Sequence, residues 1–250
     1  MAEQNVYDNE EFFNGYTQIR NQESNKNNIF EKPALFSLLP DLKDKTILDL
    51  GCGYGENCME FIRKGSGKVI GIDISKKMLE VARKENSDSR IEYKNMPMEE
   101  IGSLKEEFDI VVSSLAMHYV QDYSGLVKNV FRLLNKNGLF IFSQENPLNT
   151  CFTTGNRWTR DENDEKIFAN ISNYGMDGER ESKWFINNVK KYHRTFSTTI
   201  NTLIEKGFEV KKMIEPVPTK EILEKHPEYK DLFHKPDFLL VKAVKKYRTV

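Results

Sequence analysis

Short apolar runs alternate with longer amphipathic stretches along most of this 250-residue chain. The pattern predicts strands at residues 46–50, 68–73, 91–95, 108–114 and 138–145, and helices at 56–64, 76–85 and 123–134. Alternation of this kind is typical of βαβ units, in which helices cover a mainly parallel sheet. We therefore expect an α/β fold with helices on both faces of the sheet.

Both ends of the chain add elements to this pattern. Two helices are predicted before the first strand, at 10–20 and 29–39. Four elements, alternately helix and strand, are predicted near the C-terminus, at 197–206, 208–216, 219–226 and 237–244.

Between residues 146 and 192 the alternation stops in a polar stretch that contains Trp158, Tyr174 and Trp184. Connections longer than about 15 residues are usually functional or disordered, and the aromatic residues favour an ordered segment. We predict one domain over 1–250, made of a helical arm (1–42), a sheet core (43–145 and 196–250) and an inserted substrate-side cap (146–195).

The charge of the chain is close to balanced, because 37 Lys and Arg residues face 38 Asp and Glu residues, for a net charge of -1. Proteins that bind DNA or RNA usually carry a basic surplus. We therefore expect a small-molecule partner and no nucleic acid.

Several features favour a cytoplasmic chain without a membrane span. No apolar run approaches the ~18 residues that a spanning helix needs. The start, MAEQNVYDNEEFF, is acidic and polar where a secretory signal is basic and then apolar. The three cysteines are an odd number in a chain large enough to fold without disulfides, and the four histidines share no metal-ligand spacing with them. We expect no metal site, and a monomer or homodimer.

The segment ILDLGCGYG (47–55) combines a buried strand, a glycine loop and the start of a helix. Gly51, Gly53 and Gly55 allow a sharp turn and let backbone amides approach a ligand that a Cβ atom would push away. The loop leads to a helix N-terminus, where free N–H groups favour negative charge. A tight turn that binds nothing is the alternative.

Asp73 ends the second predicted strand, 18 residues after Gly55. In nucleotide-binding α/β folds an acid at about this distance accepts hydrogen bonds from ribose hydroxyls; here the alternative is a solvated acid that caps the next helix. Dinucleotide folds need glycine at position 56, where this chain has Glu56, whose charge repels a pyrophosphate. With Asp49 just before the loop, the site suits a ligand that carries an ammonium group and a ribose.

At these residues the sequence resembles the class I S-adenosylmethionine-dependent methyltransferases. ILDLGCGYG matches the first motif of that family and GIDIS the second, while FDIVVSSLAMHYV and LLNKNGLFIFSQENP resemble the segments around its fourth and fifth strands. The similarity covers most of the chain and is closest to small-molecule enzymes of the ubiquinone and menaquinone biosynthesis type. It implies a doubly wound, Rossmann-like sheet of seven strands, mostly parallel with an antiparallel last strand. The implied cofactor is S-adenosyl-L-methionine, with S-adenosyl-L-homocysteine as product.

The resemblance also assigns cofactor contacts. Asp49 is expected to hold the methionine ammonium, Asp73 the ribose hydroxyls and Ile74 the adenine. Family members often carry an aspartate near the adenine where this chain has Pro97, so Met98 and Glu99 are the expected substitutes. The other expected contacts, around the methionine and ribose, are Gly51, Cys52, Gly53, Ser114 and Leu115.

Two residues of the first helix, Tyr16 and Arg20, are one turn apart and face the same side. They either close over the cofactor, with Arg20 pairing its carboxylate, or serve as helix packing and solvated surface.

In-line transfer of a methyl group needs an aligned nucleophile and exclusion of water more than a fixed catalytic set. For an acceptor that loses a proton, the expected catalytic bases are His118, in the loop after the fourth strand, and His193, although both can be structural. Glu145, at the end of the fifth strand, is either a base in contact with the substrate or a fold anchor.

Further substrate contacts are expected in the same loop and in the cap. Tyr119 either contacts cofactor or substrate or packs beside Phe12. Arg194 either orients an anionic substrate or anchors the cap, and Trp184 either lines a pocket or belongs to the core of the cap.

Two other functions fit parts of the pattern. One is a nicotinamide-dependent oxidoreductase, which Glu56 disfavours. The other is a protein that binds S-adenosylmethionine as a sensor or scaffold without catalysis. The sequence leaves open whether oxygen, nitrogen, carbon or sulfur of the acceptor is methylated.

Overall fold

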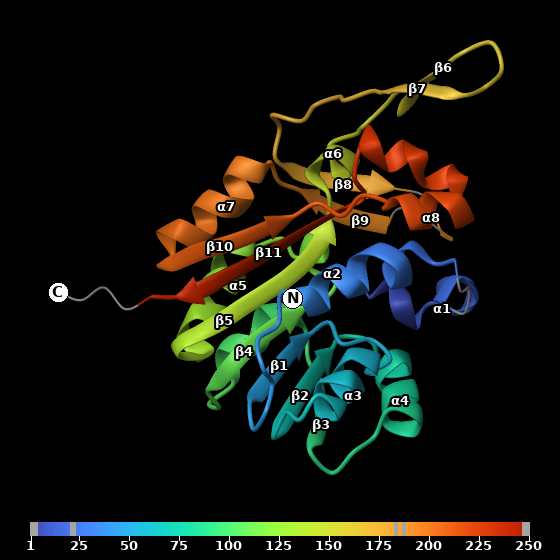
Figure 1. The fold of residues 1–250 in the computed structure, drawn as a ribbon. Coiled ribbons are helices and arrows are strands. Elements are labelled where there is room, and N and C mark those ends of the chain that lie inside the picture. Colours follow the sequence, from blue (N-terminus) through green and yellow to red (C-terminus); the bar gives the residue numbers. More distant parts are fainter. Residues whose placement is uncertain (1–4, 21–23, 183–184, 187–188, 247–250) are drawn as a thin grey trace.

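The computed structural model describes residues 5–20, 24–182, 185–186 and 189–246, without the side chains of residues 19, 20 and 182. At its centre lies a seven-stranded sheet in the order β10-β11-β5-β4-β1-β2-β3 (Figure 1). β11 pairs antiparallel with both β5 and β10, and the other described pairs in this sheet are parallel. The predicted doubly wound sheet, mostly parallel with an antiparallel last strand, is therefore confirmed.

Across this sheet the strands are β10 (Phe208–Ile214), β11 (Phe238–Lys245), β5 (Leu134–Glu145), β4 (Phe108–Ser113), β1 (Thr46–Leu50), β2 (Lys68–Asp73) and β3 (Ile91–Asn95). The α-helices are α1 (Glu10–Arg20), α2 (Lys32–Ser37), α3 (Glu56–Arg63), α4 (Lys76–Glu85), α5 (Tyr123–Leu133), α6 (Pro147–Thr150), α7 (Phe196–Glu205) and α8 (Lys220–Lys225). A π-helix, η2 (Asn27–Glu31), precedes α2, and the 3₁₀ helices are η1 (Val6–Asp8), η3 (Met98–Ser103), η4 (Met117–Tyr119) and η5 (Pro227–Phe233).

The central strands divide their side chains between two hydrophobic layers. Leu48 and Leu50 of β1 pack into the layer under α5 and α7, whereas Ile47 packs into the layer under α2 and α3. Successive side chains of a strand point to opposite faces, so a strand that is buried on both sides is apolar at nearly every position. This is why TILDL and its neighbouring strands form the middle of the sheet.

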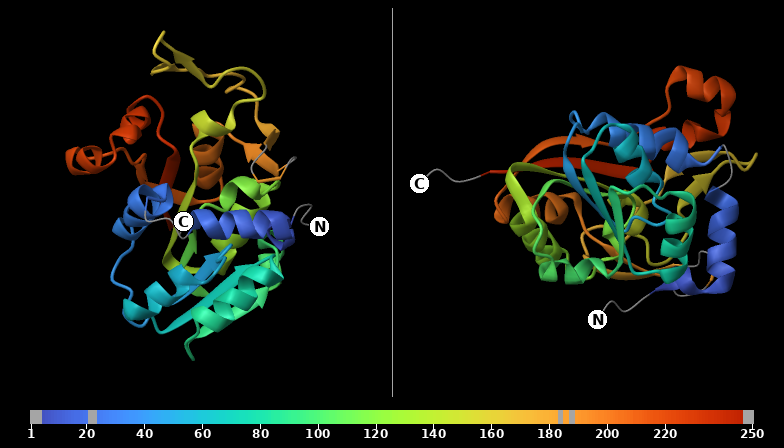
Figure 2. Two further views of the ribbon diagram at one scale, coloured as in Figure 1. Left: turned by 90° about the vertical axis from the view of Figure 1, so that its right-hand side faces the viewer. Right: turned by 90° about the horizontal axis from the view of Figure 1, so that it is seen from below.

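The strand order creates a crevice at one edge of the sheet. From β1 the chain winds outward through β2 to β3, then returns to the other side of β1 as β4 and continues to β5. The loops that follow β1 and β4 therefore leave in opposite directions, and ligands of open α/β sheets bind at such a reversal. In Figure 2 (left) α1 crosses in front of this edge.

The cap region contains regular structure that the sequence pattern did not indicate. β6 (Trp158–Arg160) pairs with β7 (Lys166–Ala169), and β8 (Gly178–Ser182) pairs with β9 (Val189–His193), each as a separate two-stranded sheet. The β6–β7 hairpin projects from the body of the molecule (Figure 1). The division into arm, core and cap stays our interpretation of this arrangement.

Two predicted elements differ from the structure by more than a shift of one or two residues at an end. β5 begins at Leu134 instead of Gly138, because Leu134 pairs with Phe108 before a register shift, and Asn137 takes a left-handed conformation within the strand. The predicted helix at 29–39 is divided into the π-helix η2 and the shorter α2.

We expect Phe140→Ala to lower the free energy of unfolding by about 3–5 kcal/mol, because the substitution leaves a cavity in the central layer. Phe140 is fully buried, with its ring centroid 4.9 Å from that of Phe142. The matched control is Phe168→Ala in the projecting hairpin, where 64% of the residue is exposed and the expected change is within about 0.5 kcal/mol. Urea unfolding followed by circular dichroism measures both, and equal losses would contradict the placement of Phe140.

Candidate functional site

The glycine loop between β1 and α3 lies tight against the loop that follows β4. Gly51 has a φ of +70°, and a Cβ atom added to it would lie 2.6 Å from the Cβ of Ala116. Both the left-handed conformation and the close approach exclude a larger residue. The amides of Gly51 and Cys52 donate to the carbonyl of Ile72, which fixes the loop to the end of β2.

A cavity of about 500 Å³ lies along this edge of the sheet. Twelve of the predicted site residues line it: Tyr16, Gly51, Gly53, Asp73, Ile74, Met98, Glu99, Ser114, Leu115, His118, Tyr119 and Glu145. The lining residues that sequence reasoning did not assign include Tyr7, Asn25, Asn27, Gln121, Asp122, Lys190, Tyr192 and Phe238. Most of these come from the arm and the cap, where no strand pattern indicated which side chains turn inward.

Asp73 lies in the cavity wall at the carboxyl end of β2. Its Oδ2 accepts a hydrogen bond from the amide of Gly53 (2.9 Å), and its Oδ1 accepts one from the amide of Ser75 (2.8 Å). Burial raises the pKa of Asp73 to about 6, although these amide bonds oppose the rise. Each carboxylate oxygen keeps a further lone pair for a ligand hydroxyl.

The N-terminal arm is hydrogen-bonded to the residues that follow Asp73. Asp8, at the end of η1, accepts hydrogen bonds through Oδ1 from the hydroxyl of Ser75 (2.6 Å) and the amide of Lys77 (3.2 Å). The side chain of Asn5 donates to the carbonyl of Ile74 (3.3 Å). The arm therefore closes over the end of β2 through bonds to the loop that follows Asp73.

Asp49 lies behind the glycine loop, outside the cavity lining. It is 1% exposed; its Oδ2 accepts a bond from the Cys58 thiol (3.3 Å), and its Oδ1 has no hydrogen-bond partner among the described residues. Burial raises the pKa of Asp49 to about 7, and the negative charges of Asp73 and Glu31 add to the rise. Cys52 lines a smaller neighbouring cavity of about 50 Å³.

Glu31 is a third carboxylate in this region, and sequence reasoning missed it. It is 2% exposed, and its Oε1 accepts hydrogen bonds from the hydroxyls of Ser114 (2.9 Å) and Ser143 (2.5 Å). The available signal was an acid on the apolar side of the predicted helix, four residues before Leu35. Glu31 also lines the smaller cavity, beside Cys52.

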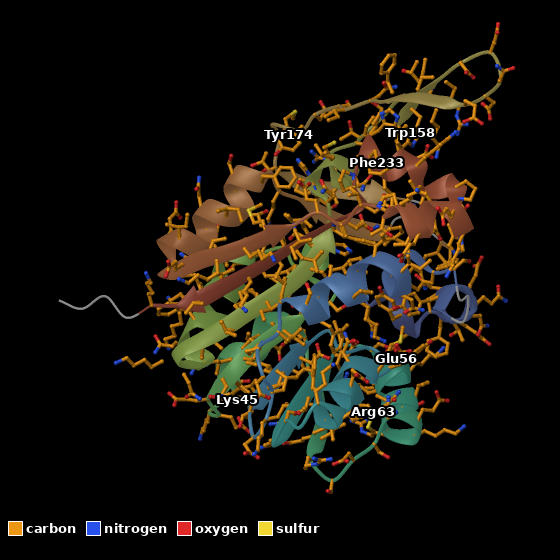
Figure 3. All side chains as sticks on the ribbon, viewed as in Figure 1. Lys45, Glu56, Arg63, Trp158, Tyr174 and Phe233 are labelled. Atoms are coloured by element: carbon orange, nitrogen blue, oxygen red, sulfur yellow. The ribbon has the colours of Figure 1, made fainter. Side chains whose placement is uncertain are left out.

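Glu56 stands where dinucleotide-binding folds carry glycine, and it pairs with Lys32 of α2 (3.2 Å). Its acidic side chain lies at the start of α3 (Figure 3). The N-terminus of that helix therefore presents an ion pair where a pyrophosphate would bind.

The arm supplies aromatic side chains to the cavity. Tyr7 and Tyr16 line it with their rings edge to face, 5.3 Å between centroids, and the Tyr7 hydroxyl donates to that of Tyr119 (3.4 Å). Phe12 packs in the same cluster, so Tyr119 both packs beside the arm and borders the cavity. The side chain of Arg20 lies outside the described residues.

At the β5 end of the cavity, Glu145 and His118 lie next to each other. The backbone amide of Glu145 donates to His118 Nδ1 (3.3 Å), and His118 Nε2 lies 3.9 Å from Glu145 Oε1. Lys191 of β9 donates to the same Oε1 (2.5 Å). Burial lowers the pKa of His118 to about 4. Burial raises the pKa of Glu145, but the nearby His118 and Lys191 outweigh it, and the net shift is downward.

The structure does not bring His193 or Arg194 into the cavity lining. His193 bonds through Nδ1 to the Thr150 hydroxyl and through Nε2 to the Tyr174 carbonyl, both at 2.8 Å. Arg194 is 8% exposed and donates to the carbonyls of Val120 and Gln121. Its guanidinium therefore joins the cap to the chain that follows η4, and a contact between Arg194 and a substrate stays a prediction.

The aromatic residues of the cap contact one another and the C-terminal segments. The ammonium groups of Lys166 and Lys235 lie over the Trp158 ring, 4.8 Å and 5.1 Å from its centroid, and Tyr174 packs against His193. Figure 3 shows Trp158 and Tyr174 among the cap segments, apart from Glu56. Trp184 lies outside the described residues.

The described part of the chain holds neither a candidate metal site nor a candidate membrane-spanning helix. No group of three or more His, Cys, Asp or Glu side chains there is arranged to hold a metal ion. None of the helices there is long and apolar enough to cross a membrane.

Known proteins are similar to this chain in sequence and in fold. A profile of the family described as a methyltransferase domain matches residues 41–215. An uncharacterised protein of Haemophilus influenzae is 39% identical over 246 residues, which is 96% of each chain. A ubiquinone biosynthesis O-methyltransferase of Neisseria meningitidis is 33% identical over 110 residues, which cover 42% of this chain and 46% of that enzyme.

A solved structure extends the comparison. The crystal structure of an S-adenosylmethionine-dependent methyltransferase from Mesorhizobium loti superposes with a TM-score of 0.79 and 36% identity, over 86% of this chain and 97% of that one. The family match at 41–215 includes the glycine loop and the strand that ends at Asp73. The chain belongs to the S-adenosylmethionine-dependent methyltransferases.

Proposed function

We propose that this methyltransferase transfers the methyl group of S-adenosylmethionine to a small-molecule acceptor by in-line displacement. The observation that carries the proposal is the cavity of about 500 Å³ along the sheet edge, between Asp73 at the end of β2 and Glu145 at the end of β5. Its volume lies within the usual range for small-molecule sites. The two carboxylates are three strand spacings apart, about 14 Å, which leaves room for two ligands side by side.

The residues at the β2 end fit the cofactor. Asp73 offers lone pairs to ribose hydroxyls, while Ile74 and Met98 offer apolar surface to the adenine. The ammonium group of S-adenosylmethionine fits the region close to the glycine loop, because the buried carboxyl groups of Glu31 and Asp49 favour a positive charge there. We assign these residues to cofactor binding, together with Gly51, Gly53, Glu99, Ser114 and Leu115.

When bound, S-adenosylmethionine supplies an electrophilic methyl group whose leaving sulfur departs without charge. The chain itself has to align the acceptor and exclude water. Tyr7 and Tyr16 close the cavity on the arm side, and Tyr119 and Tyr192 border it at the loop and the cap. The rings of these four tyrosines surround the methyl acceptor with apolar surface, and their hydroxyl groups supply polar atoms.

Other features support a small acceptor in the cytoplasm. The net charge of -1 gives no basic surplus for a nucleic acid, and the partial similarity to a ubiquinone biosynthesis O-methyltransferase is to an enzyme that acts on a small molecule. The cysteines Cys52, Cys58 and Cys151 are buried and unbridged, which suits a reducing compartment.

We expect calorimetry to show binding of S-adenosylhomocysteine, and Asp73→Asn to weaken it roughly ten- to hundredfold. Hydrogen bonds to a charged group contribute about 1.5–3 kcal/mol, and the amide loses that charge. Glu85→Gln on the exposed end of α4 is the matched control and leaves the affinity unchanged. Thermal unfolding of each variant confirms that the chain is folded.

The alternative functions give different results in the same set of assays. Absence of S-adenosylhomocysteine binding, or enhancement of NADH fluorescence, would overturn the proposal. Incubation of the protein with radiolabelled S-adenosylmethionine and a metabolite extract tests transfer. Tight binding without any labelled product would favour a sensor.

We expect the ligand-free protein to lose stability as the pH rises from about 4 to about 7. Burial raises the pKa of Asp49 to about 7 and that of Asp73 to about 6, above the ~3.9 of an exposed aspartate. Between these values the two carboxyl groups bind more protons in the folded state than in the unfolded state. They outnumber His118, whose lowered pKa of about 4 has the opposite effect, so the free energy of unfolding falls as the pH rises.

Urea unfolding at several pH values between about 4 and about 8 measures this decline. Asp49→Asn removes one of the two titrating groups and is expected to flatten the curve, whereas Glu85→Gln is expected to leave it parallel to that of the unmodified protein. Saturating S-adenosylmethionine, which is cationic, is expected to flatten it as well. A decline of the same slope in Asp49→Asn would contradict the role of this carboxyl group.

A further inference from the structure

The proton position on His118 follows from a backbone hydrogen bond. The amide of Glu145 donates to His118 Nδ1, and a ring nitrogen that accepts a hydrogen bond carries no proton. The neutral ring then carries its proton on Nε2, because the partner of one nitrogen fixes the state of the other. His118 is 4% exposed, and this burial, together with the charges of Lys191 and Arg194, disfavours a second proton more than Glu145 favours it.

His118 Nε2 is therefore a donor at the cavity wall. No hydrogen bond from Nε2 to a described residue is present; Glu145 Oε1, at 3.9 Å, is beyond hydrogen-bond distance. The ring packs against that of Tyr119 at a tilt of 43°, with 4.3 Å between centroids, which helps to hold its orientation. In this state the ring cannot accept a proton at Nε2, so His118 does not fit the base predicted for it.

Glu145 is the acceptor beside this donor. Its Oε1 is engaged by Lys191, whose side chain is 13% exposed, while Oε2 accepts no hydrogen bond from the described residues. The side chain of Glu145 lines the cavity and is 29% exposed. Lys191 thus fixes one oxygen of the carboxylate and leaves the other for a ligand.

A methyl-accepting group that binds both side chains must accept a hydrogen bond from His118 Nε2–H and donate one to the carboxylate of Glu145. A carboxylate accepts from His118 but is repelled by Glu145, and a protonated amine has no lone pair to accept with. A neutral amine has one lone pair, and pairing it with His118 leaves none to attack the methyl group. A hydroxyl donates its proton to Glu145, accepts from His118 with one lone pair and attacks with the other.

We propose, on the basis of the function proposed above, that the enzyme methylates a hydroxyl group, with His118 Nε2–H as the hydrogen-bond donor that orients the oxygen and Glu145 as the base. The hydroxyl oxygen forms the new O–CH₃ bond while the C–S bond of the sulfonium breaks and its electron pair passes to sulfur. The hydroxyl proton passes to Glu145 Oε2. Lys191 is a positioning residue that holds the carboxylate.

The tautomer of His118 is tested by ¹⁵N NMR of histidine-labelled protein saturated with S-adenosylhomocysteine, with His118→Gln to assign its signals. We expect an unprotonated Nδ1 and a protonated Nε2 throughout the neutral pH range. An unprotonated Nε2, or titration near the ordinary histidine pKa of about 6.5, would overturn the proposal. Saturation is measured first, because absence of S-adenosylhomocysteine binding overturns the proposed function instead.

The substrate class is tested with radiolabelled S-adenosylmethionine and five probes: phenol, benzyl alcohol, aniline, benzylamine and benzoate. We expect label in at least one hydroxyl compound and slower transfer, or none, to the amines and the carboxylate. Faster transfer to an amine or to benzoate, or no transfer to either hydroxyl compound, would overturn the proposal.

Variants separate the two roles on the hydroxyl probe. Glu145→Gln is expected to lower the rate roughly hundredfold and to make it rise with pH, because the acceptor must then lose its proton to solvent. His118→Ala is expected to lose about tenfold, and His118→Gln, which keeps an N–H donor, to lose less. Glu162→Gln in the exposed β6–β7 loop is the control. A pH-independent rate in Glu145→Gln would show that Glu145 is not the base.

Discussion

The hydrogen bonds around the carboxylate of Asp73 are the interaction on which the rest of the site depends. One oxygen binds the amide of Gly53 and the other binds that of Ser75, so one side chain joins the glycine loop to the start of α4. The Ser75 hydroxyl then binds Asp8 and draws the arm over the same strand end. The glycine loop, the start of α4 and the arm are thereby attached to one another around Asp73 and Ser75. A carboxylate in this position costs stability while it is ionised and buried, and a cationic ligand offsets that cost.

The parts of the site that the sequence predicted are those that local rules control. The strand TILDL, the glycines after it and Asp73 follow from hydrophobic pattern, backbone conformation and spacing, and the structure places them along one sheet edge. Glu31 was not predicted by such rules, because its partners lie far away in the sequence: Ser114 in the loop after β4 and Ser143 in β5. The cap hairpins were also missed, since short two-stranded sheets depend on what they pack against more than on their own pattern.

The acceptor end of the cavity is assembled from three separate parts of the chain. Glu145 comes from the end of β5, His118 from the loop after β4 and Lys191 from the cap strand β9. Arg194, three residues after Lys191, binds the carbonyls that follow η4. The cap therefore holds both the carboxylate and the loop that carries the histidine. No motif spacing reports such a cluster, which explains why the sequence suggested His118 and Glu145 one by one and did not suggest Lys191.

The number of residues in the π-helix η2 sets how the cavity-lining residues at its start are oriented relative to Glu31 and α2. A π-helical turn contains one residue more than an α-helical turn, and each residue turns the chain by about 100°. If α2 keeps its packing, Glu31 keeps its orientation toward Ser114 and Ser143. Loss of one residue from Asn27–Phe30 would then rotate the residues before the deletion, among them the cavity-lining Asn25. Among related chains, a deletion at this point would therefore separate the shared fold from this form of the cofactor pocket.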